Sequence, residues 1–255
     1  MNIHLDITQG NAYRSNSQRA RVITEHWVNE NLYCPNCENA TLSRLPNNTA
    51  VADFVCKVCE DQFELKSKNG PFGSKIVDGA YSTMIKRIKS SDNPNFILMN
   101  YSLETAVVEN LFVIPKHFIS PIIIEKRRPL AATAVRANWI GCNLNVGLLP
   151  KAGKIVIIHN QEILHIQAVR QCWKETTFLR EMRISGKTWL IEIIKCIEIM
   201  NKERFVLSDI YRFEPHLAKI FTSNNHIKDK IRQQLQFLRN QNYLKFEGNG
   251  NYRVL

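Results

Sequence analysis

Hydrophobic residues in the first two thirds of the chain follow two different periods. Apolar positions three or four residues apart predict helices over residues 17–29 and 79–89. Short apolar runs predict strands, which fall at residues 50–55, 63–66, 96–101, 107–114 and 154–158. Helices and strands in this mixed order are typical of an α/β or α+β domain of the kind that carries a catalytic site.

The last third of the chain is predicted to be mainly helical and to end in a β-hairpin. Helical patterns cover residues 188–200, 208–213, 215–221 and about 225–240, with Thr188, Ser208 and either Asn224 or Asn225 as expected N-caps and Pro215 in a first turn. Two alternating runs, 243–246 and 252–255, then flank the Gly248-Asn249-Gly250 turn. This order is typical of a winged-helix domain. The short polar stretch 183–187 marks the boundary, which gives domains over residues 1–183 and 184–255.

Charge narrows the class of partner. The chain carries 34 Lys and Arg against 23 Asp and Glu, a net charge of +11, and residues 187–255 alone hold 12 basic and 7 acidic side chains. This surplus suggests a polyanionic partner, with nucleic acid as the first candidate, although a basic protein without such a partner has the same composition. No run of 18 apolar residues is present, and the first ten residues lack both a basic start and an apolar stretch. We therefore expect no membrane span, no secretory signal and a cytoplasmic location.

Seven cysteines include two close pairs, Cys34-Pro-Asn-Cys37 and Cys56-Lys-Val-Cys59, with 18 residues between them. Two such knuckles can place four thiolates around one Zn²⁺ ion, and a full set of protein ligands implies a structural role. The alternative is four buried, reduced cysteines without metal. The other three, Cys142, Cys172 and Cys196, have no partner at ligand spacing and are expected to pack in the core.

Acidic and basic side chains flank the second cysteine pair. Asp53 lies three residues before it, and Glu64-Leu65-Lys66 follows it. Glu64 and Lys66 would share one face of a strand, and Asp53 would meet them if the two segments pair as a hairpin with the knuckle at its tip. Asp53 and Glu64, with the Leu65 carbonyl, could then hold one or two Mg²⁺ ions, which prefer oxygen ligands.

Such a site suits metal-assisted hydrolysis of a phosphodiester. A coordinated water would act as nucleophile, and Lys66 would orient it or neutralise transition-state charge, with a depressed pKa if the ammonium is partly desolvated. The spacing of Asp53, Glu64 and Lys66 resembles that of the PD-(D/E)xK nuclease superfamily, with Ala52 where that superfamily often has Pro. A solvated strand face is the alternative. Glu25, on the first predicted helix, is either a further acid of this site or a surface residue.

The last long helix is predicted to read DNA. Its apolar stripe would face inward and consists of Ile227, Ile231, Leu235 and Leu238. The opposite side carries residues that can form paired hydrogen bonds with guanine or adenine in the major groove: Asn225, Arg232, Gln233 and Gln236. Side chains suited to phosphates or the minor groove are Lys228 and Arg239 on the helix and Lys245 and Arg253 in the hairpin. The alternative is a solvated helix face on a protein-binding winged helix.

Several longer motifs follow one another along the chain. They are Ser15-Asn-Ser-Gln18, Tyr33-Cys-Pro-Asn-Cys37, Val51-Ala-Asp-Phe54, Phe63-Glu-Leu-Lys-Ser-Lys68, Asp78-Gly-Ala-Tyr81, Trp139-Ile-Gly-Cys142, and Asn224-Asn-His-Ile-Lys228 through Ile231-Arg-Gln-Gln-Leu235. In this order they resemble the motifs of the DpnI-type methyl-directed restriction endonucleases, also called dam-replacing proteins. The resemblance covers nearly the whole chain. It implies a PD-(D/E)xK nuclease core with an inserted four-cysteine zinc site, followed by a winged-helix domain.

The resemblance also implies a specific activity. Enzymes of this type, termed type IIM, cut duplex DNA at GATC only when the adenine is N6-methylated, leave blunt ends and use Mg²⁺. By carry-over, the catalytic residues are Asp53, Glu64 and Lys66, the zinc ligands are Cys34, Cys37, Cys56 and Cys59, and both domains contact DNA. Trp139, in a loop-like stretch beside Arg136, is our hypothesis for one apolar wall against the methyl group. The alternative for Trp139 is a place in the core, which we expect for Trp189. We expect a monomer in solution.

Two other functions stay open. One is a nuclease of the same superfamily with a different target, such as an unmodified site or a repair junction. The other is a non-enzymatic, zinc-containing winged-helix regulator in which Asp53, Glu64 and Lys66 are ordinary surface charges. Dependence on a divalent metal separates the regulator from both nucleases, and a comparison of methylated with unmethylated plasmid separates the two nucleases.

Overall fold

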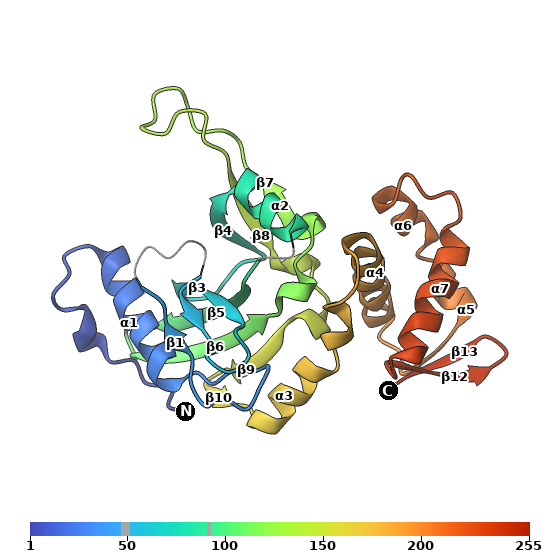
Figure 1. Cartoon of the computed structure of the whole chain (residues 1–255), viewed down its shortest axis with the longest axis horizontal. Coiled ribbons are helices and arrows are strands. Elements are labelled where there is room, and N and C mark those ends of the chain that lie inside the picture. The colour runs from blue at the N-terminus through green and yellow to red at the C-terminus, as the bar shows by residue number, and fades with distance from the viewer. Residues whose placement is uncertain (47–51, 91–92) are drawn as a thin grey trace. The chain divides into compact units, whose positions relative to one another are not determined.

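A computed structural model describes residues 1–46, 52–90 and 93–255 (Figure 1). The chain divides into two compact units. The N-terminal unit comprises residues 1–148 and 152–177, and the C-terminal unit comprises residues 149–151 and 178–255. Among the residues described, no helix combines the length and the apolar character that a bilayer crossing requires.

A central sheet organises the N-terminal unit, and in the described part of the chain it has seven strands. Their order is β1 (Ser43–Arg44), β2 (Phe54–Val55), β3 (Gln62–Asn69), β5 (Asn95–Ser102), β6 (Val107–Ile114), β9 (Ile155–His159) and β10 (Glu162–Ile163). Strands β3 and β5 are parallel and the other neighbouring pairs are antiparallel. The five predicted strands therefore exist, although residues 50–51 of the first lie outside the described part of the chain.

Helices α1 (Asn16–Asn31) and α3 (Ile166–Lys174) pack against this sheet, α1 beside β3 and α3 beside β9. Each contributes a fully buried tryptophan, Trp27 and Trp173, to one hydrophobic core shared with the strands. Core residues of β3 and β5, such as Phe63 and Ile97, belong to the same cluster. This burial stabilises the central sheet on which the candidate catalytic residues lie.

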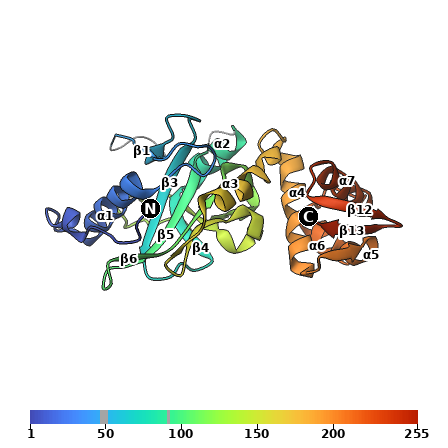
Figure 2. The same cartoon turned by 90° about the horizontal axis from the view of Figure 1, so that it is seen from below.

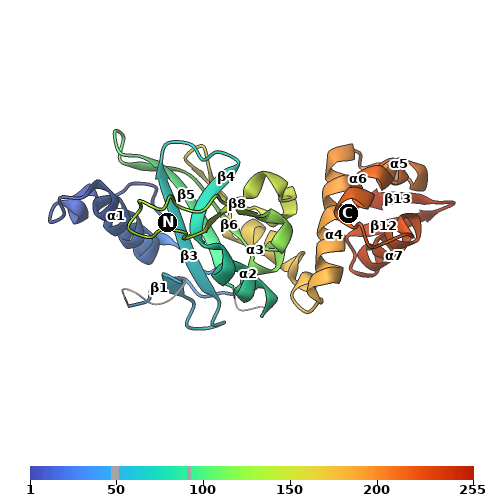
Figure 3. The same ribbon diagram turned by 90° about the horizontal axis from the view of Figure 1, so that it is seen from above.

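A second sheet covers another part of the N-terminal unit. It has the antiparallel order β4 (Lys75–Ala80), β8 (Gly141–Asn145) and β7 (Ile124–Lys126), and α2 (Tyr81–Lys89) packs on it, as Figures 1 and 3 show. Residues 127–140, called the arm below, join β7 to β8 and extend away from the sheet (Figure 1). None of these three strands was predicted. The described part of the chain also contains short 3-10 turns at Ile7–Gly10, Lys116–Phe118, Pro121–Ile123, Val146–Leu148, Lys151–Gly153 and Thr177–Leu179.

The C-terminal unit has the predicted helices and hairpin. Its elements are α4 (Ile184–Met200), β11 (Arg204–Val206), α5 (Leu207–Tyr211), α6 (Glu214–Ile220), α7 (Ile227–Asn240), β12 (Leu244–Gly248) and β13 (Asn251–Val254). The three strands form one small sheet, and the hairpin of β12 and β13 extends beyond the helices (Figure 2). Trp189 is buried and stacks on Phe221 with ring centroids 3.6 Å apart, so it is a core residue as predicted.

Helix boundaries in this unit differ from the predicted ones. Helix α4 begins at Ile184, so most of the predicted joint 183–187 is helical, and the Thr188 hydroxyl donates to the Ile184 carbonyl at 2.8 Å instead of capping the helix. Ser208 lies inside α5, whose N-cap is Val206. Hydroxyl side chains can bond within a helix as well as cap it, so a sequence signal for a cap does not fix the boundary.

The start of α7 also differs. Its N-cap position is His226, and the Asn224 side chain accepts a hydrogen bond from the His226 N–H at 2.8 Å. Asn225 is exposed before the helix. Pro215, in contrast, occupies the first turn of α6 as predicted.

Candidate active site and DNA-reading face

Four cysteines meet at the edge of the N-terminal unit. The Sγ atoms of Cys34, Cys37, Cys56 and Cys59 all lie within 4.8 Å of one another. Cys34 and Cys59 are 3.7 Å apart and Cys37 and Cys56 are 3.4 Å apart, Sγ to Sγ. Four thiolates bound tetrahedrally at about 2.3 Å from Zn²⁺ would be about 3.8 Å apart, so the cluster could hold a metal ion of this kind.

Hydrogen-bond donors surround these sulfurs. The Asn39 side-chain amide donates to the Cys56 Sγ at 3.3 Å. Burial raises the pKa of Cys56, but this donor and the backbone N–H groups of Cys59 and Val58 outweigh it and lower that pKa to about 6. These donors favour the thiolate of Cys56, which is the form that binds metal, whereas burial raises the pKa of Cys34 and of Cys59.

The other three cysteines do not share one environment. Cys142 and Cys196 are buried, as predicted, whereas Cys172 is exposed on α3. The expectation that Cys172 packs in the core is therefore wrong. It lies on the outer side of a helix whose buried positions are Val169 and Trp173.

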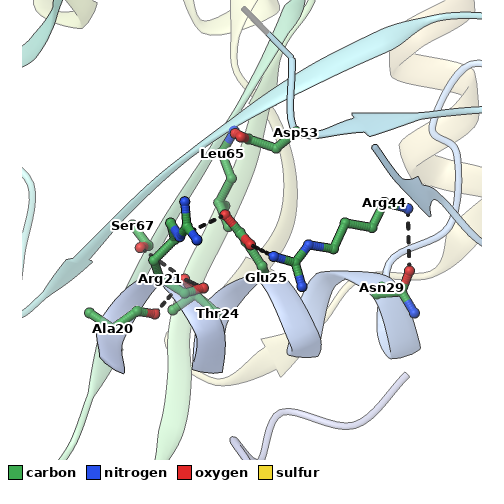
Figure 4. A network of polar contacts seen from close by, with 9 residues as sticks. All are labelled: Ala20, Arg21, Thr24, Glu25, Asn29, Arg44, Asp53, Leu65 and Ser67. Carbon is green, nitrogen blue, oxygen red and sulfur yellow. Dashed lines mark hydrogen bonds and ion pairs between the residues drawn. The ribbon is translucent and has the colours of Figure 1, made fainter. Parts of the chain in front are cut away.

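The second cysteine knuckle forms the tip of a β-hairpin that positions Asp53. Strands β2 and β3 pair with Phe54 opposite Phe63, and the Asp53 N–H donates to the Phe63 carbonyl at 2.9 Å. Next to this pair, the partner of β3 is the side chain of Asp53 and not the backbone of β2. The Asp53 Oδ2 accepts a hydrogen bond from the Leu65 N–H at 2.7 Å (Figure 4). The predicted hairpin is thus present, and Asp53 lies beside Leu65.

The alternation of β3 separates core residues from polar ones. Phe63 and Leu65 pack on the core, and the Ser67 hydroxyl lies 3.1 Å from that of Thr24 in α1 (Figure 4). Glu64 and Lys66 point to the opposite face and meet there, with the Lys66 Nζ 2.6 Å from the Glu64 Oε1. The predicted pairing of these two side chains on one face is confirmed.

A third acid completes the cluster. Asp78, in β4, accepts a hydrogen bond at its Oδ1 from the Lys66 Nζ at 2.7 Å, so the ammonium lies between two carboxylates. Sequence reasoning gave Asp78 no role, because β4 was not predicted and its partner lies 12 residues away on another sheet. The Asp78-Gly-Ala-Tyr81 motif was the only signal at this position.

The charges of the cluster shift each other's pKa. Burial raises the pKa of Glu64, the Lys66 ammonium lowers it, and Asp78 and Asp53 raise it further, to about 7. Burial works against a charged Lys66, but the charges of Glu64 and Asp78 outweigh it and raise the pKa of Lys66. The prediction of a depressed lysine pKa is therefore wrong, because it considered desolvation without the charges of Glu64 and Asp78.

A buried carboxylate oxygen makes this cluster suitable for a cation. Among the described residues, the Glu64 Oε2 is buried and accepts no hydrogen bond. Carboxylate oxygens in this state favour a bound cation, and Mg²⁺ takes such hard ligands. The residues present therefore fit the ion that the sequence predicts.

Glu25 is neither a surface residue nor a partner of Glu64 in the described contacts. It is buried in α1 and its carboxylate lies 2.6 Å from the Arg44 Nη2 and 3.6 Å from the Arg21 Nε (Figure 4). Burial raises the pKa of Glu25 above its ordinary value. The two arginines oppose this rise, and Asp53 adds to it. The surface interpretation is therefore wrong, and the carboxylate is paired with two arginines.

The candidate DNA-reading face of α7 has the predicted orientation. Its buried residues include the whole predicted stripe, namely Ile227, Ile231, Leu235 and Leu238. The exposed residues of α7 include the predicted readers Lys228, Arg232, Gln233 and Gln236, and also Arg239, whereas Asn225 is exposed but lies before the helix, so its predicted place on the helix is wrong. In the hairpin, Lys245 is exposed and Arg253 is half-buried, with its Nε 3.7 Å from the Glu247 Oε1.

One residue of this face was missed. Tyr211, at the end of α5, receives a hydrogen bond on its hydroxyl from the Arg232 Nε. The Arg232 guanidinium and the Lys228 ammonium lie 5.7 Å and 5.6 Å from the centre of the Tyr211 ring. Tyr211 therefore holds two basic side chains on the exposed side of the unit.

Trp139, at the end of the arm, is half-buried and lies against the backbone of β8. A methyl group added at Gly141 would come within 2.8 Å of two carbons of its indole ring, so this close approach requires glycine. The arm is closed by a hydrogen bond from the Leu130 N–H to the Trp139 carbonyl at 3.0 Å. Trp139 is thus not a core tryptophan, and part of its ring is accessible.

Sequence models of known families match both units. The model DpnI, described as the Dam-replacing family, matches residues 1–182. The model DpnI_C, described as the Dam-replacing HTH domain, matches residues 185–254. The two matches together extend over nearly the whole chain.

Proposed function

Since the chain belongs to the DpnI, or Dam-replacing, family, whose membership points to a methyl-directed restriction endonuclease, we propose that it cleaves duplex DNA at GATC sites containing N6-methyladenine. The proposal includes Mg²⁺-dependent hydrolysis and blunt ends. The observation that supports it most is the cluster of Asp53, Glu64 and Lys66 on and beside β3. A regulator without enzymatic activity has no need of a half-buried lysine held between carboxylates.

Two metals have separate roles in this proposal. Zn²⁺, held by Cys34, Cys37, Cys56 and Cys59, stabilises the hairpin tip that precedes the catalytic strand. Asp53 and Glu64, with the Leu65 carbonyl, are the ligands for Mg²⁺. When bound, Mg²⁺ would supply a Lewis acid that favours deprotonation of water and offsets negative charge on the phosphate.

The remaining steps belong to side chains of the N-terminal unit. Lys66 brings a positive charge to the same face of β3 as Glu64, where it neutralises charge that develops on the scissile phosphate and orients the attacking water. Asp53 is fixed by its hydrogen bond with the Leu65 N–H, so its free oxygen keeps one direction. The half-buried site limits competing water, which strengthens each of these interactions.

Recognition is divided between the predicted domains 1–183 and 184–255. In the second domain, Arg232, Gln233, Gln236 and Asn225 read base edges, while Lys228, Lys245 and Arg253 contact the backbone. In the first, Trp139 forms one wall against the methyl group, which is worth only about 0.8 kcal/mol through burial alone. If both domains must contact the methylated site, their modest preferences for the methyl group would multiply. We propose that the protein is a monomer in solution.

The test is cleavage of plasmid DNA from a dam-positive and a dam-negative host, each with Mg²⁺ or EDTA. We expect only the methylated plasmid to be cut, only with Mg²⁺, at GATC. Cleavage of both plasmids would retain the nuclease and reject methyl dependence. Binding without cleavage of either plasmid would support the regulator and reject the proposal.

A further inference from the structure

We propose that Asp78 is a positioning residue that holds the Lys66 ammonium in place for cleavage, an inference that rests on the proposed nuclease function. Its Oδ1 accepts from the Lys66 Nζ at 2.7 Å, and only 5% of the Asp78 side chain is exposed. Nothing in the family matches assigns this residue a role. The proposal concerns how Lys66 is held, and Asp78 itself need not touch DNA.

The Asp78 carboxylate is itself fixed by the backbone. The same Oδ1 accepts a second hydrogen bond, from the Gly79 N–H at 2.7 Å. The pairing of β4 with β8 is irregular between Asp78 and Ala80, and the Cys142 Sγ donates to the Gly79 carbonyl at 3.4 Å across this irregularity. A bulge of this kind re-aims a side chain, and here it directs a carboxylate at the lysine.

A second carboxylate solves a problem that Glu64 alone would create. Lys66 lies 2.6 Å from the Glu64 Oε1, the same carboxylate that is expected to bind Mg²⁺. An ammonium held only by Glu64 would compete with that ion for one group and lose its partner when the ion binds. Asp78 remains as a partner of opposite charge on the other side of the ammonium, so Lys66 keeps its position.

The two partners of Lys66 come from different sheets. Glu64 is in β3 of the central sheet, whereas Asp78 is in β4 of the second sheet. Across β4, Asp78 is paired with Cys142 and Ala80 with Gly141, the residue against which Trp139 packs. The residue that we propose to position Lys66 therefore lies in the strand pair β4 and β8, next to the end of the arm.

The test compares Asp78→Asn with the wild-type full-length, zinc-containing protein. Asparagine is nearly isosteric and keeps an acceptor for the Gly79 N–H, but it removes the charge that holds Lys66. We measure the single-turnover cleavage rate on saturating methylated GATC duplex, the Mg²⁺ concentration for half-maximal rate, the duplex Kd without Mg²⁺, and the melting temperature. We expect the rate to fall about 10- to 100-fold, as for other residues that orient an active-site group. The half-maximal Mg²⁺ concentration and the duplex Kd should change less than about twofold, and the melting temperature by only a few degrees.

Glu125→Gln is the matched control. Glu125 also pairs with a lysine in the second sheet, Lys75, at 2.7 Å, but it lies away from Lys66 and is more exposed. We expect this variant to cleave at the wild-type rate. If Asp78→Asn also cleaves at the wild-type rate, the proposal is wrong. If it needs much more Mg²⁺ but reaches the full rate, Asp78 is a metal ligand and the positioning role is likewise overturned.

A double variant tests whether Asp78 acts through Lys66. We expect Asp78→Asn to lower the residual rate of Lys66→Ala by less than twofold, because the group it positions is already gone. A further tenfold loss would contradict the proposal. Should the asparagine variant lose zinc or melt early, Asp78→Glu is measured instead. This variant keeps the charge but displaces the carboxylate from the Lys66 Nζ, so we again expect a lower cleavage rate, and a wild-type rate would contradict the proposal. A wild-type protein that cuts no DNA would instead reject the proposed function, so the two failures are distinguishable.

Discussion

The two units differ in how exposed their candidate functional side chains are. In the N-terminal unit, the side chains of Glu64 and Lys66 are 17% and 20% exposed and contact each other closely. In the C-terminal unit, the side chains of Arg232 and Lys228 are 58% and 52% exposed on the outer face of α7. Both units are basic, so charge alone does not distinguish them.

Under the proposed function, this difference matches what each unit would do. Charges in a half-buried cluster interact strongly and are already oriented, which is what stabilisation of a transition state requires. Side chains that read base edges must be accessible and lose water only when DNA arrives. Substitutions in the acid–lysine cluster should therefore change rates at constant affinity, and substitutions on α7 should change affinity at constant rate. The predictions below probe this contrast, from the largest expected effect to the smallest.

The largest effect is expected from the four-cysteine cluster, the proposed zinc site. Cys56→Ser leaves three of four ligands, and because structural zinc contributes on the order of 10 kcal/mol to a small site, we expect loss of the metal and a fall of roughly 10 °C or more in the melting temperature. The zinc content of the purified protein shows whether the metal is lost, and thermal unfolding gives the melting temperature. Cys172→Ser, which removes an exposed thiol of the same unit, is the control and should change neither quantity. A Cys56→Ser protein with full stability and one bound zinc would argue against the four-cysteine site.

Arg232→Ala should weaken binding of the methylated duplex by about 1–3 kcal/mol, because a paired contact with a guanine edge is lost. At saturating DNA its cleavage rate should equal that of the wild type. Fluorescence anisotropy on GATC duplexes and on duplexes with single base changes gives the affinity and its sequence dependence. Arg204→Ala is the control, since Arg204 is an exposed arginine of β11 that pairs with Glu247. Equal losses on all duplexes would assign Arg232 to phosphate and not to a base.

The smallest effect is expected at Trp139. Trp139→Ala removes one apolar wall for a single methyl group, so the ratio of methylated to unmethylated cleavage should fall about fourfold, which corresponds to about 0.8 kcal/mol. The two rates are measured on matched duplexes with the folded, zinc-containing variant. Leu130→Ala, an exposed apolar change in the same arm, should leave the ratio unchanged. An unaltered ratio in Trp139→Ala would remove this residue from the account.

Local patterns explain what could be predicted from the sequence. Period-two alternation correctly put Glu64 and Lys66 on one face, and the spacing of the cysteine pairs correctly brought four sulfurs together. The apolar stripe of α7 gave the orientation of its exposed face. Each of these depends on neighbours within a few residues or on one tight turn.

What was missed depends on contacts between distant segments. Asp78 reaches Lys66 only because β4 pairs with β8, more than 60 residues later in the chain, and no local pattern marks that pairing. The raised pKa of Lys66 follows from the charge of Glu64 together with that of Asp78. Glu25 is buried because Arg44, on another segment, neutralises it, and Tyr211 meets Arg232 across two helices. Short strands and isolated charges carry too little periodicity to predict such pairings.

The most direct test of the contrast between the units is Glu64→Gln, measured on one methylated GATC duplex for both binding and cleavage. The variant keeps the size of Glu64 but removes the charge expected to hold Mg²⁺. We predict that single-turnover cleavage with Mg²⁺ becomes undetectable while the Kd measured without Mg²⁺ stays within twofold of the wild type. Cleavage at the wild-type rate would show that catalysis lies elsewhere, and a large loss of affinity would contradict the separation of cutting from reading.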